Sequence, residues 1–252
     1  MNEPVPGLSL ILACYNEAPW LEHSVREIAA ILDASGMTYE IIFVDDASTD
    51  GTREVIAGII AARPEGRMKA VWHVCNTGRG RAVFDGMREA SGEIVGFIDA
   101  DLEVHPRYIP ACCEAIRRGA QVAVGRRTFA FVARGLWRRF LSRGYSALAH
   151  LLLPLGNVRD TESNCKFFLR ATALPVLATV EDPAWFWDTE SMVRCHLAGL
   201  AIVEVPCRYV RNPAKPSTVR IVRDIVQSLA KLVAFRRRLD RSGLLAKRRG
   251  AA

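Results

Sequence analysis

Three acidic side chains follow a short apolar run near the middle of the chain, and their spacing suggests a cation site. The run Val95–Ile98 is followed by Asp99, Asp101 and Glu103. If the backbone stays extended there, alternate side chains point to one side, and all three carboxylates can hold one ion. Mg²⁺ and Mn²⁺ prefer such oxygen ligands together with the phosphates of a substrate. The segment therefore predicts a Mg²⁺ or Mn²⁺ site, with an acidic turn before the next helix as the alternative.

Two further polar clusters follow apolar runs that are typical of buried strands. Asn16 and Glu17 come after Leu8–Cys14, and Asp45-Asp46 come after Glu40–Val44. Continuous apolar runs of this length indicate central strands of a parallel sheet. In such sheets ligands bind beyond the carboxyl ends of the strands. We therefore expect the three polar clusters to line one crevice.

Helical and strand-like segments alternate through the first half, which predicts a doubly wound, mostly parallel α/β sheet. The remaining predicted strands are Lys69–Val74, Ile94–Ile98, Gln121–Gly125, Lys166–Leu169 and Ala201–Val205. Helices are predicted at Trp20–Leu32, Thr52–Ala62, Gly80–Ala90, from Pro106 onward, at Leu136–Leu153, at Phe186–Ala198 and from Val219 to Arg236. We expect a main domain over residues 1–212, followed over 213–252 by a closing loop, an amphipathic basic helix and a basic tail.

Positive charge is concentrated in two regions. From Cys207 to Ala252 there are 13 Lys and Arg residues against 2 Asp, whereas the rest of the chain has 21 basic and 25 acidic residues. Nine arginines also lie between Glu114 and Asp160 with no acidic residue among them. Such clusters indicate anionic partners, namely nucleotide phosphates, acidic lipid or nucleic acid. The final predicted helix could lie on anionic lipid, or its apolar stripe could pack on the body or on a small membrane partner.

The sequence shows no pattern typical of a disulfide framework, a zinc site or a membrane span. The seven cysteines contain no Cys-x-x-Cys pair, and the five histidines are dispersed. We therefore expect reduced, buried thiols and no zinc site. The first residues lack the basic region of a signal peptide, and the apolar runs are too short to span a bilayer. We expect a chain that does not cross a membrane by itself.

The order of the motifs resembles a known family. Tyr15-Asn16-Glu17, Val44–Thr52, Asn76–Gly80 and Asp99-Ala100-Asp101 resemble the inverting GT-A glycosyltransferases with an Asp-x-Asp motif. Strings in the second half resemble the polyprenyl-phosphate sugar synthases, that is, dolichyl-phosphate mannose synthases and dolichyl-phosphate glucosyltransferases. These strings are Val124–Arg127, Arg138–Arg143, Arg159–Phe168, Trp187–Glu190 and Glu204–Pro206. The resemblance covers about residues 8 to 235 and implies a GT-A fold.

The resemblance also implies roles for individual residues. Metal binding is implied for Asp99, Asp101 and Glu103, and catalytic roles for Asp99, Asp101, Arg127, Arg138, Arg139 and Asp160. Nucleotide-sugar binding is implied for Ala13, Tyr15, Asn16, Glu17, Val44, Asp46, Arg79, Ala100, Lys166, Asp188, Arg211 and Ser217. Asp46 would read the base or ribose, and Arg211 and Ser217 would belong to a closing loop. For Asp160, Glu162 and Asp188, helix capping or surface pairing is the alternative to contact with sugar hydroxyls or service as a base.

The predicted function is inverting transfer of a hexose from GDP-mannose or a UDP-hexose to a polyprenyl phosphate, by a peripheral protein at the cytoplasmic membrane face. The chain departs from the family at Ala13, Asn164-Cys165 and Thr218, where proline, Gly-Phe and lysine are usual. These departures leave open a transferase with a soluble acceptor. A nucleic-acid-binding module is a third hypothesis, which the near absence of aromatic residues in the basic tail disfavours.

Overall fold

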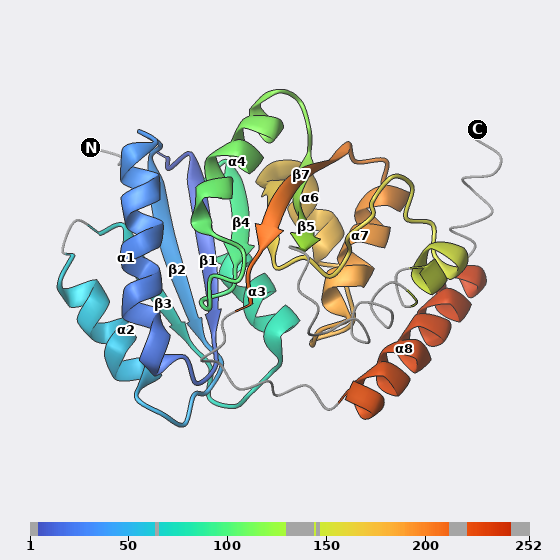
Figure 1. Ribbon diagram of the computed structural model, residues 1–252, viewed down its shortest axis with the longest axis horizontal. Helices are drawn as coiled ribbons and strands as arrows, with labels where there is room; N and C mark the ends of the chain where they lie inside the picture. The colour runs from blue at the N-terminus through green and yellow to red at the C-terminus, as the bar shows by residue number, and fades with distance from the viewer. Residues whose placement is uncertain (1–4, 64–65, 130–143, 145–146, 212–220, 243–252) are drawn as a thin grey trace.

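The computed structural model describes residues 5–63, 66–129, 144, 147–211 and 221–242. Its centre is a seven-stranded sheet with the strand order β3-β2-β1-β4-β6-β5-β7 (Figure 1). The strands are β1 Leu8–Cys14, β2 Tyr39–Asp45, β3 Met68–Trp72, β4 Ile94–Ile98, β5 Val122–Phe129, β6 Cys165–Leu169 and β7 Ile202–Tyr209. The first four run parallel to one another, whereas β6 is antiparallel to both of its neighbours, β4 and β5.

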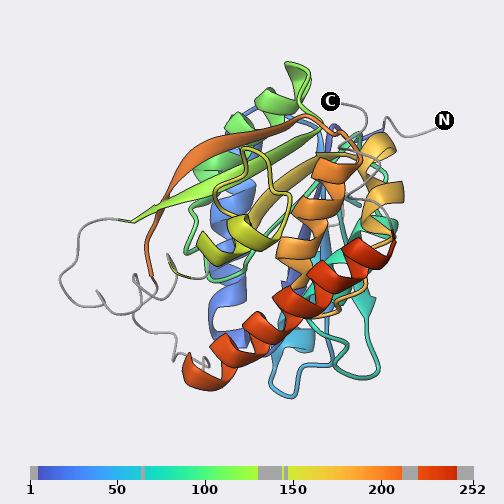
Figure 2. The same ribbon diagram turned by 90° about the vertical axis from the view of Figure 1, so that its right-hand side faces the viewer.

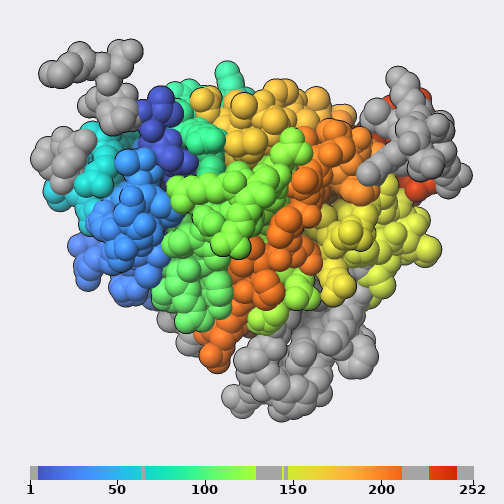
Figure 3. Space-filling view, turned by 90° about the horizontal axis from the view of Figure 1, so that it is seen from above, coloured from blue at the N-terminus to red at the C-terminus, as the bar shows by residue number. Residues whose placement is uncertain are grey.

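Helices cover both faces of the sheet. They are α1 Ala18–Ala34, α2 Thr52–Ala61, α3 Arg79–Arg88, α4 Ile109–Arg117 after a 3₁₀ turn at Pro106–Tyr108, α6 Arg170–Leu177, α7 Trp187–Leu197 and α8 Ile221–Arg241. Buried side chains of α1, α2 and α4 pack on one face, and those of α3, α6, α7 and α8 pack on the other. In Figure 3 the two halves of the chain, coloured blue to green and yellow to red, form one continuous body.

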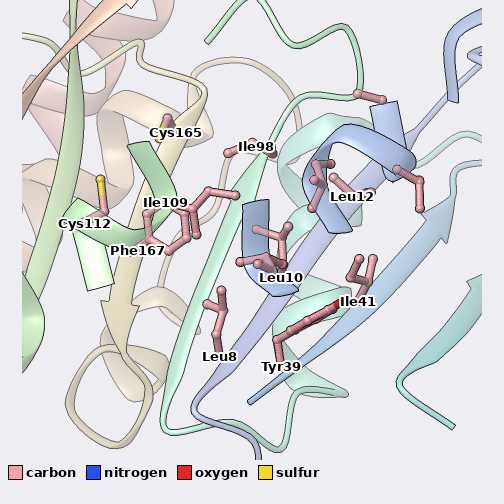
Figure 4. Packing of buried hydrophobic residues seen from close by; sticks show 14 of the residues in the cluster. Leu8, Leu10, Leu12, Tyr39, Ile41, Ile98, Ile109, Cys112, Cys165 and Phe167 are labelled. Carbon is pink, nitrogen blue, oxygen red and sulfur yellow. The ribbon is translucent and has the colours of Figure 1, made fainter. Parts of the chain in front are cut away.

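The alternation of side chains along β1 explains this two-sided core. Leu8, Leu10 and Leu12 belong to the core on the face covered by α1 (Figure 4). Ile11 belongs to the core on the opposite face. Successive side chains of a strand point to opposite faces, so a strand covered on both sides is apolar throughout. The run at Leu8–Cys14 therefore marks a central strand, as predicted.

Most predicted elements are present, but the second half differs from the sequence prediction in two ways. Strands β5 and β7 pair in parallel from Val122–Ile202 to Phe129–Tyr209, well beyond the predicted ends. Their polar outer segments gave no strand signal, and Pro206 is tolerated because β7 lies at the edge of the sheet. Helix α6, which contains Pro175, was not predicted. Most of the predicted helix Leu136–Leu153 lies outside the described residues.

Helix α8 packs on the body through its apolar residues. Leu232, Phe235 and Leu239 are buried, and the Phe235 ring contacts Phe186 edge-on with the ring centres 5.7 Å apart. In Figure 2 the red helix crosses the face of the molecule over the orange α7. The described part of the apolar stripe thus packs on the protein itself. In the described parts of the chain, no helix combines the length and apolar character needed to span a membrane.

Candidate active site

The chain bends sharply just beyond three neighbouring strands. Asn16 after β1, Ala47 after β2 and Leu102 after β4 adopt left-handed backbone conformations, with φ of 58°, 59° and 53°. Alanine and leucine pay about 1–2 kcal/mol for this conformation, whereas asparagine tolerates it, and such strain clusters at functional sites. Because β2, β1 and β4 are adjacent and parallel, the three bends lie along one edge of the sheet. The three polar clusters thus lie at the same edge of the sheet, and that they line one ligand crevice remains a prediction.

Hydrogen bonds join the loops that follow β1 and β2. The Asn16 side-chain oxygen accepts from the Thr49 amide at 2.8 Å, and the Asn16 amide donates to the Ser48 hydroxyl at 3.0 Å. The Glu17 amide donates to the Thr52 hydroxyl at 2.8 Å. These contacts explain why Asn, Ser and Thr occur at the strand ends, since their side chains satisfy backbone groups in tight turns.

Asp46 organises the loop between β3 and α3. One of its carboxylate oxygens accepts from the Thr77 amide and hydroxyl, both at 2.8 Å, and from His73 Nδ1 at 2.7 Å. The other oxygen accepts from the Gly78 amide at 2.9 Å. Burial alone would raise the pKa of Asp46, but these donors lower it below its ordinary value. In the structure Asp46 thus stays ionised and holds the loop; its contact with a base or ribose remains a prediction.

Arg79 joins carboxylates from the two halves of the chain. Its Nε and Nη2 donate to Asp99 Oδ1 at 3.0 and 2.6 Å, and its Nη1 donates to Asp188 Oδ2 at 2.7 Å. Burial lowers the pKa of Arg79, but the charges of Asp99, Asp188 and Asp101 outweigh this effect and raise it. The guanidinium therefore remains charged at the centre of the site.

Gly80 allows α3 and α7 to approach closely enough for Arg79 to reach Asp188. A Cβ atom at Gly80 would lie 2.3 Å from the Cβ of Trp187 and 2.7 Å from the Ala184 carbonyl oxygen. Any larger residue would push the two helices apart. The Gly-Arg-Gly sequence at the start of α3 thus has a packing reason.

Lys166 on β6 is wholly buried and binds the carboxylate oxygen of Asp188 that Arg79 does not contact. Its ammonium donates to Asp188 Oδ1 and, at 2.5 Å, to the Ser163 carbonyl oxygen. Burial lowers the pKa of Lys166, and Asp188 opposes that effect. Asp188, which is also buried, therefore bridges two cations.

Asn164 holds the second oxygen of Asp99. Its Nδ2 donates to Asp99 Oδ2 at 3.0 Å, which fixes the amide because the reversed amide would set its oxygen against a carboxylate. The Asn164 Oδ1 atom is buried and has no hydrogen-bond partner among the described residues. The departure from the usual Gly-Phe thus places an unused acceptor beside Asp99.

The segment after β4 is a turn, so the expectation of an extended segment is wrong. The Leu102 amide donates to the Asp99 carbonyl oxygen at 3.2 Å, and the left-handed Leu102 reverses the chain. The Glu103 carboxylate accepts a hydrogen bond from the Tyr209 hydroxyl on β7. Consequently no group of three His, Cys, Asp or Glu side chains in the described residues forms a metal cluster.

A divalent ion nevertheless fits a smaller set of these carboxylates. Asp99 is 22% exposed, and Asp101 is partly exposed two residues further along the same turn. Mg²⁺ is commonly held by one or two carboxylates plus substrate phosphates, without a complete protein cage. Asp101, with Asp99 beside it, provides that donor set, whereas Glu103 is bound to Tyr209.

Arg127 is paired with Asp160. Its amide and Nε both donate to Asp160 Oδ2 at 2.9 Å, and Nη2 donates to Oδ1 at 2.8 Å. Burial raises the pKa of Asp160, but Arg127 outweighs this effect and lowers it. For Glu162, 3.7 Å from Arg127, burial and the charges of Asp160 and Asp188 raise the pKa against the opposing effect of Arg127.

The other predicted residues differ in their access to ligands. Tyr15 and Arg211 are exposed, whereas Val44 and Ala100 are buried, so a ligand could meet these two only through the backbone. Ala13 is partly buried on β1. The predicted roles of Arg138, Arg139 and Ser217 concern residues outside the described part of the chain.

Sequence reasoning missed three polar residues of the site. His73 and Thr77 hold Asp46, and Tyr209 donates to Glu103. Isolated residues of these types carry no spacing signal. Tyr209 reaches the site through the long β5–β7 pairing and a β-bridge to Val104. Thr77, within the Asn76–Gly80 motif, was the one with a detectable signal.

This geometry agrees with comparisons to known proteins. The sequence profile described as "Glycosyl transferase family 2" matches residues 9–177, which is more than half of the chain. The chain belongs to glycosyl transferase family 2. The predicted family is thereby confirmed.

Several curated members of the family are similar to this chain. The glycosyltransferase AglD of Haloferax volcanii is 32% identical over 224 residues, which cover 87% of this chain and 35% of that protein. A dolichol-phosphate mannosyltransferase of Pyrococcus furiosus is 33% identical over 159 residues, 61% of this chain and 42% of that protein. A dolichyl-phosphate beta-glucosyltransferase of Drosophila melanogaster is 28% identical over 223 residues, 82% of this chain and 68% of that protein. The chain thus spans less than half of the first two relatives.

Solved structures confirm the GT-A fold. Glucosyl-3-phosphoglycerate synthase from Mycobacterium tuberculosis, crystallised with Mn²⁺, UDP and glucosyl-3-phosphoglycerate, matches with a TM-score of 0.67. The match has 21% identity and covers 90% of this chain and 80% of that one. A structure of the same enzyme with Mg²⁺ and UDP has a TM-score of 0.66. At this identity the likeness concerns the fold.

Proposed function

We propose that this member of glycosyl transferase family 2 transfers a hexose from GDP-mannose or a UDP-hexose to a polyprenyl phosphate. The transfer inverts the anomeric carbon and takes place at the cytoplasmic face of a membrane. The observation that carries the proposal is the bridge from Asp99 through Arg79 to Asp188 at the carboxyl ends of the strands. The dolichyl-phosphate names of two relatives support the acceptor class.

The charge balance of the site favours a donor that arrives with a divalent ion. Six carboxylates meet here, those of Asp99, Asp101, Glu103, Asp160, Glu162 and Asp188. Three described cations, Arg79, Arg127 and Lys166, offset half of that charge. An anionic diphosphate would be repelled by the remainder. When bound to Asp101 and Asp99, Mg²⁺ or Mn²⁺ supplies Lewis-acid stabilisation of the leaving diphosphate.

The protein's own groups orient the reactants. Arg79 is fixed between two carboxylates and presents a permanent positive charge near the departing diphosphate, where charge develops. The phosphate of the acceptor is already ionised near neutral pH, so it needs orientation more than deprotonation. Asp160 and Asp188 are both engaged by cations, which favours positioning roles for them over service as a base.

Transfer of radiolabelled hexose to undecaprenyl or decaprenyl phosphate tests the proposal directly. Extraction of labelled lipid is expected with one of the two donor types in the presence of Mn²⁺. Asp101→Ala should abolish transfer while leaving the free energy of unfolding near that of the wild type. Glu114→Gln, which changes an exposed carboxylate on α4, is the matched control and should retain transfer. Failure of every common donor to label the lipid would overturn the acceptor assignment.

A soluble acceptor is the second candidate, and Asn164 is the observation that favours it. Its unused oxygen lies beside Asp99, where a hydroxyl of a sugar or small acceptor could donate a hydrogen bond. Competition between polyprenyl phosphate and a mixture of small phosphorylated and hydroxylated acceptors separates the two candidates. Labelled product confined to the aqueous phase would replace the lipid acceptor by a soluble one.

A further inference from the structure

Helix α8 carries more positive charge than its acidic neighbours neutralise. Three of its cations form ion pairs, namely Lys231 with Asp182 at 2.6 Å, Arg236 with Asp240 at 3.1 Å and Arg238 with Glu181. Arg237 and Arg241, by contrast, are exposed and have no acidic partner in the described part of the chain. These two guanidiniums lie one helical turn apart, on the same face of α8.

A groove of about 400 Å³ lies along this part of α8, on the side of the segment that precedes α7. Its lining residues are Asp182, Phe186, Lys231, Ala234, Arg237, Arg238 and Arg241. The Nε atom of Arg238 is buried and has no hydrogen-bond partner among the described residues. Four of the seven lining residues are cations against one acid, so the groove suits an anion. Guanidinium groups bind phosphates with two parallel hydrogen bonds, which makes phosphate the best-matched anion.

Exposed apolar side chains adjoin this cationic surface. Val233, 40% exposed, lies one turn before Arg237 on the same face of α8. Leu151 is 79% exposed, and the carbonyl of its neighbour Leu152 accepts from Arg236 at 2.8 Å, which sets this segment beside α8 (Figure 2). A soluble phosphate would use only the cations. A membrane surface uses both, because apolar side chains enter the acyl boundary while cations meet the headgroups.

We propose that the outer face of α8, with its groove, binds the phosphate headgroups of anionic membrane lipids. This surface consists of α8 and the segments packed against it, and none of its residues belongs to the Arg79 network. Its test does not require that the proposed reaction occur, so the two proposals can fail independently.

Co-sedimentation with vesicles tests this surface. The intact chain should bind vesicles of phosphatidylcholine mixed with phosphatidylglycerol, bind pure phosphatidylcholine weakly, and dissociate as salt is raised. One arginine near an anionic surface contributes about a fivefold change in partitioning, so Arg237→Ala/Arg241→Ala should lower binding about 30-fold. Both side chains are exposed, so the variant should melt near the wild-type temperature.

A matched control removes the same charge elsewhere. Arg26 on α1 and Arg118, which caps the C-terminal end of α4, are exposed, and both helices cover the opposite face of the sheet. Arg26→Ala/Arg118→Ala should bind anionic vesicles nearly as well as the wild type. Equal losses in the two double variants would show an effect of net charge alone and overturn the site. Vesicle binding by Arg237→Ala/Arg241→Ala at the wild-type level would also overturn the proposal. If calorimetry showed that the wild type binds inorganic phosphate and that the double variant does not, while vesicle binding was unchanged, the groove would be a site for soluble phosphate instead.

Discussion

The buried pair of Lys166 and Asp188 gives the sharpest test of the network. No part of the Lys166 side chain is exposed, and Asp188 is 5% exposed. Asp188→Ala would leave the Lys166 ammonium with the Ser163 carbonyl oxygen, at 2.5 Å, as its remaining hydrogen-bond acceptor among the described residues, whereas Arg79 would keep its bonds to Asp99. Breaking a buried pair from one side costs about 3–5 kcal/mol, because the other charge stays buried. For a chain of this size that loss lowers Tm by about 6–20 °C.

Two companion variants separate the buried charge from lost packing. Lys166→Met removes the cation while Asp188 keeps Arg79 at 2.7 Å, so the expected loss is smaller, about 1–3 kcal/mol. Lys166→Met/Asp188→Leu removes both charges and should be more stable than Asp188→Ala, since apolar replacement of a buried pair is often neutral. Glu114→Ala breaks an exposed pair and should change stability by less than about 1 kcal/mol.

Urea unfolding followed by circular dichroism measures these differences, at pH 7 and at pH 9. Burial lowers the pKa of Lys166 and Asp188 opposes that effect, so Asp188→Ala should lower this pKa further. The unfolded chain then binds more protons than the folded one, and the stability of the variant should rise with pH relative to the wild type. A stability of Asp188→Ala within about 1 kcal/mol of wild type at pH 7 would refute the reasoning from buried charge.

Three further predictions concern the fold. Burial alone would raise the pKa of Glu40, but hydrogen bonds from serine groups and a lysine lower it from 4.5 to about 2. Its ionisation therefore adds about 3 kcal/mol of stability above pH 4.5, and this contribution is lost as the pH falls toward 2. Between pH 4.5 and 2 the free energy of unfolding of Glu40→Gln should therefore fall less steeply than that of the wild type. An equal pH dependence of the two proteins would contradict this. Gly80→Ala should cost about 1–3 kcal/mol through overlap with Trp187, whereas Gly58→Ala, in open space on α2, should stabilise by about 0.5–1 kcal/mol in thermal melts. Ala47→Gly should stabilise by about 1 kcal/mol by relieving the left-handed backbone, and a lower Tm would argue against strain at that bend.

The first half of the fold could be predicted because its signals are local. The buried strands β1, β2 and β4 are apolar on both faces, and their ends are marked by Asn16, Asp45 and Asp99. A doubly wound sheet then places those ends side by side without further information. The edge location of the site followed from the same pattern.

The second half could not be predicted in the same detail because its structure depends on long-range pairing. Strand β6 inserts antiparallel between β4 and β5, and this pairing carries Lys166 beneath Asp188 and Asn164 beside Asp99. No local pattern specifies that register. The turn at Leu102 was also hidden, because a left-handed leucine gives no turn signal of the kind that glycine or asparagine gives.

The charged network explains why the site lies at the junction of the two halves. Arg79 starts α3 in the first half of the chain, whereas Asp188 and Lys166 belong to α7 and β6 in the second half. Each buried charge is compensated only when α3, β4, β6 and α7 are all in place, because Asp99 on the β4 turn shares the same guanidinium. The ion pairs therefore couple the position of the Asp99 turn to the packing of the second half. A substitution on β6 or α7 can therefore affect the carboxylates of the turn through Arg79 without changing the loops that follow β1 and β2.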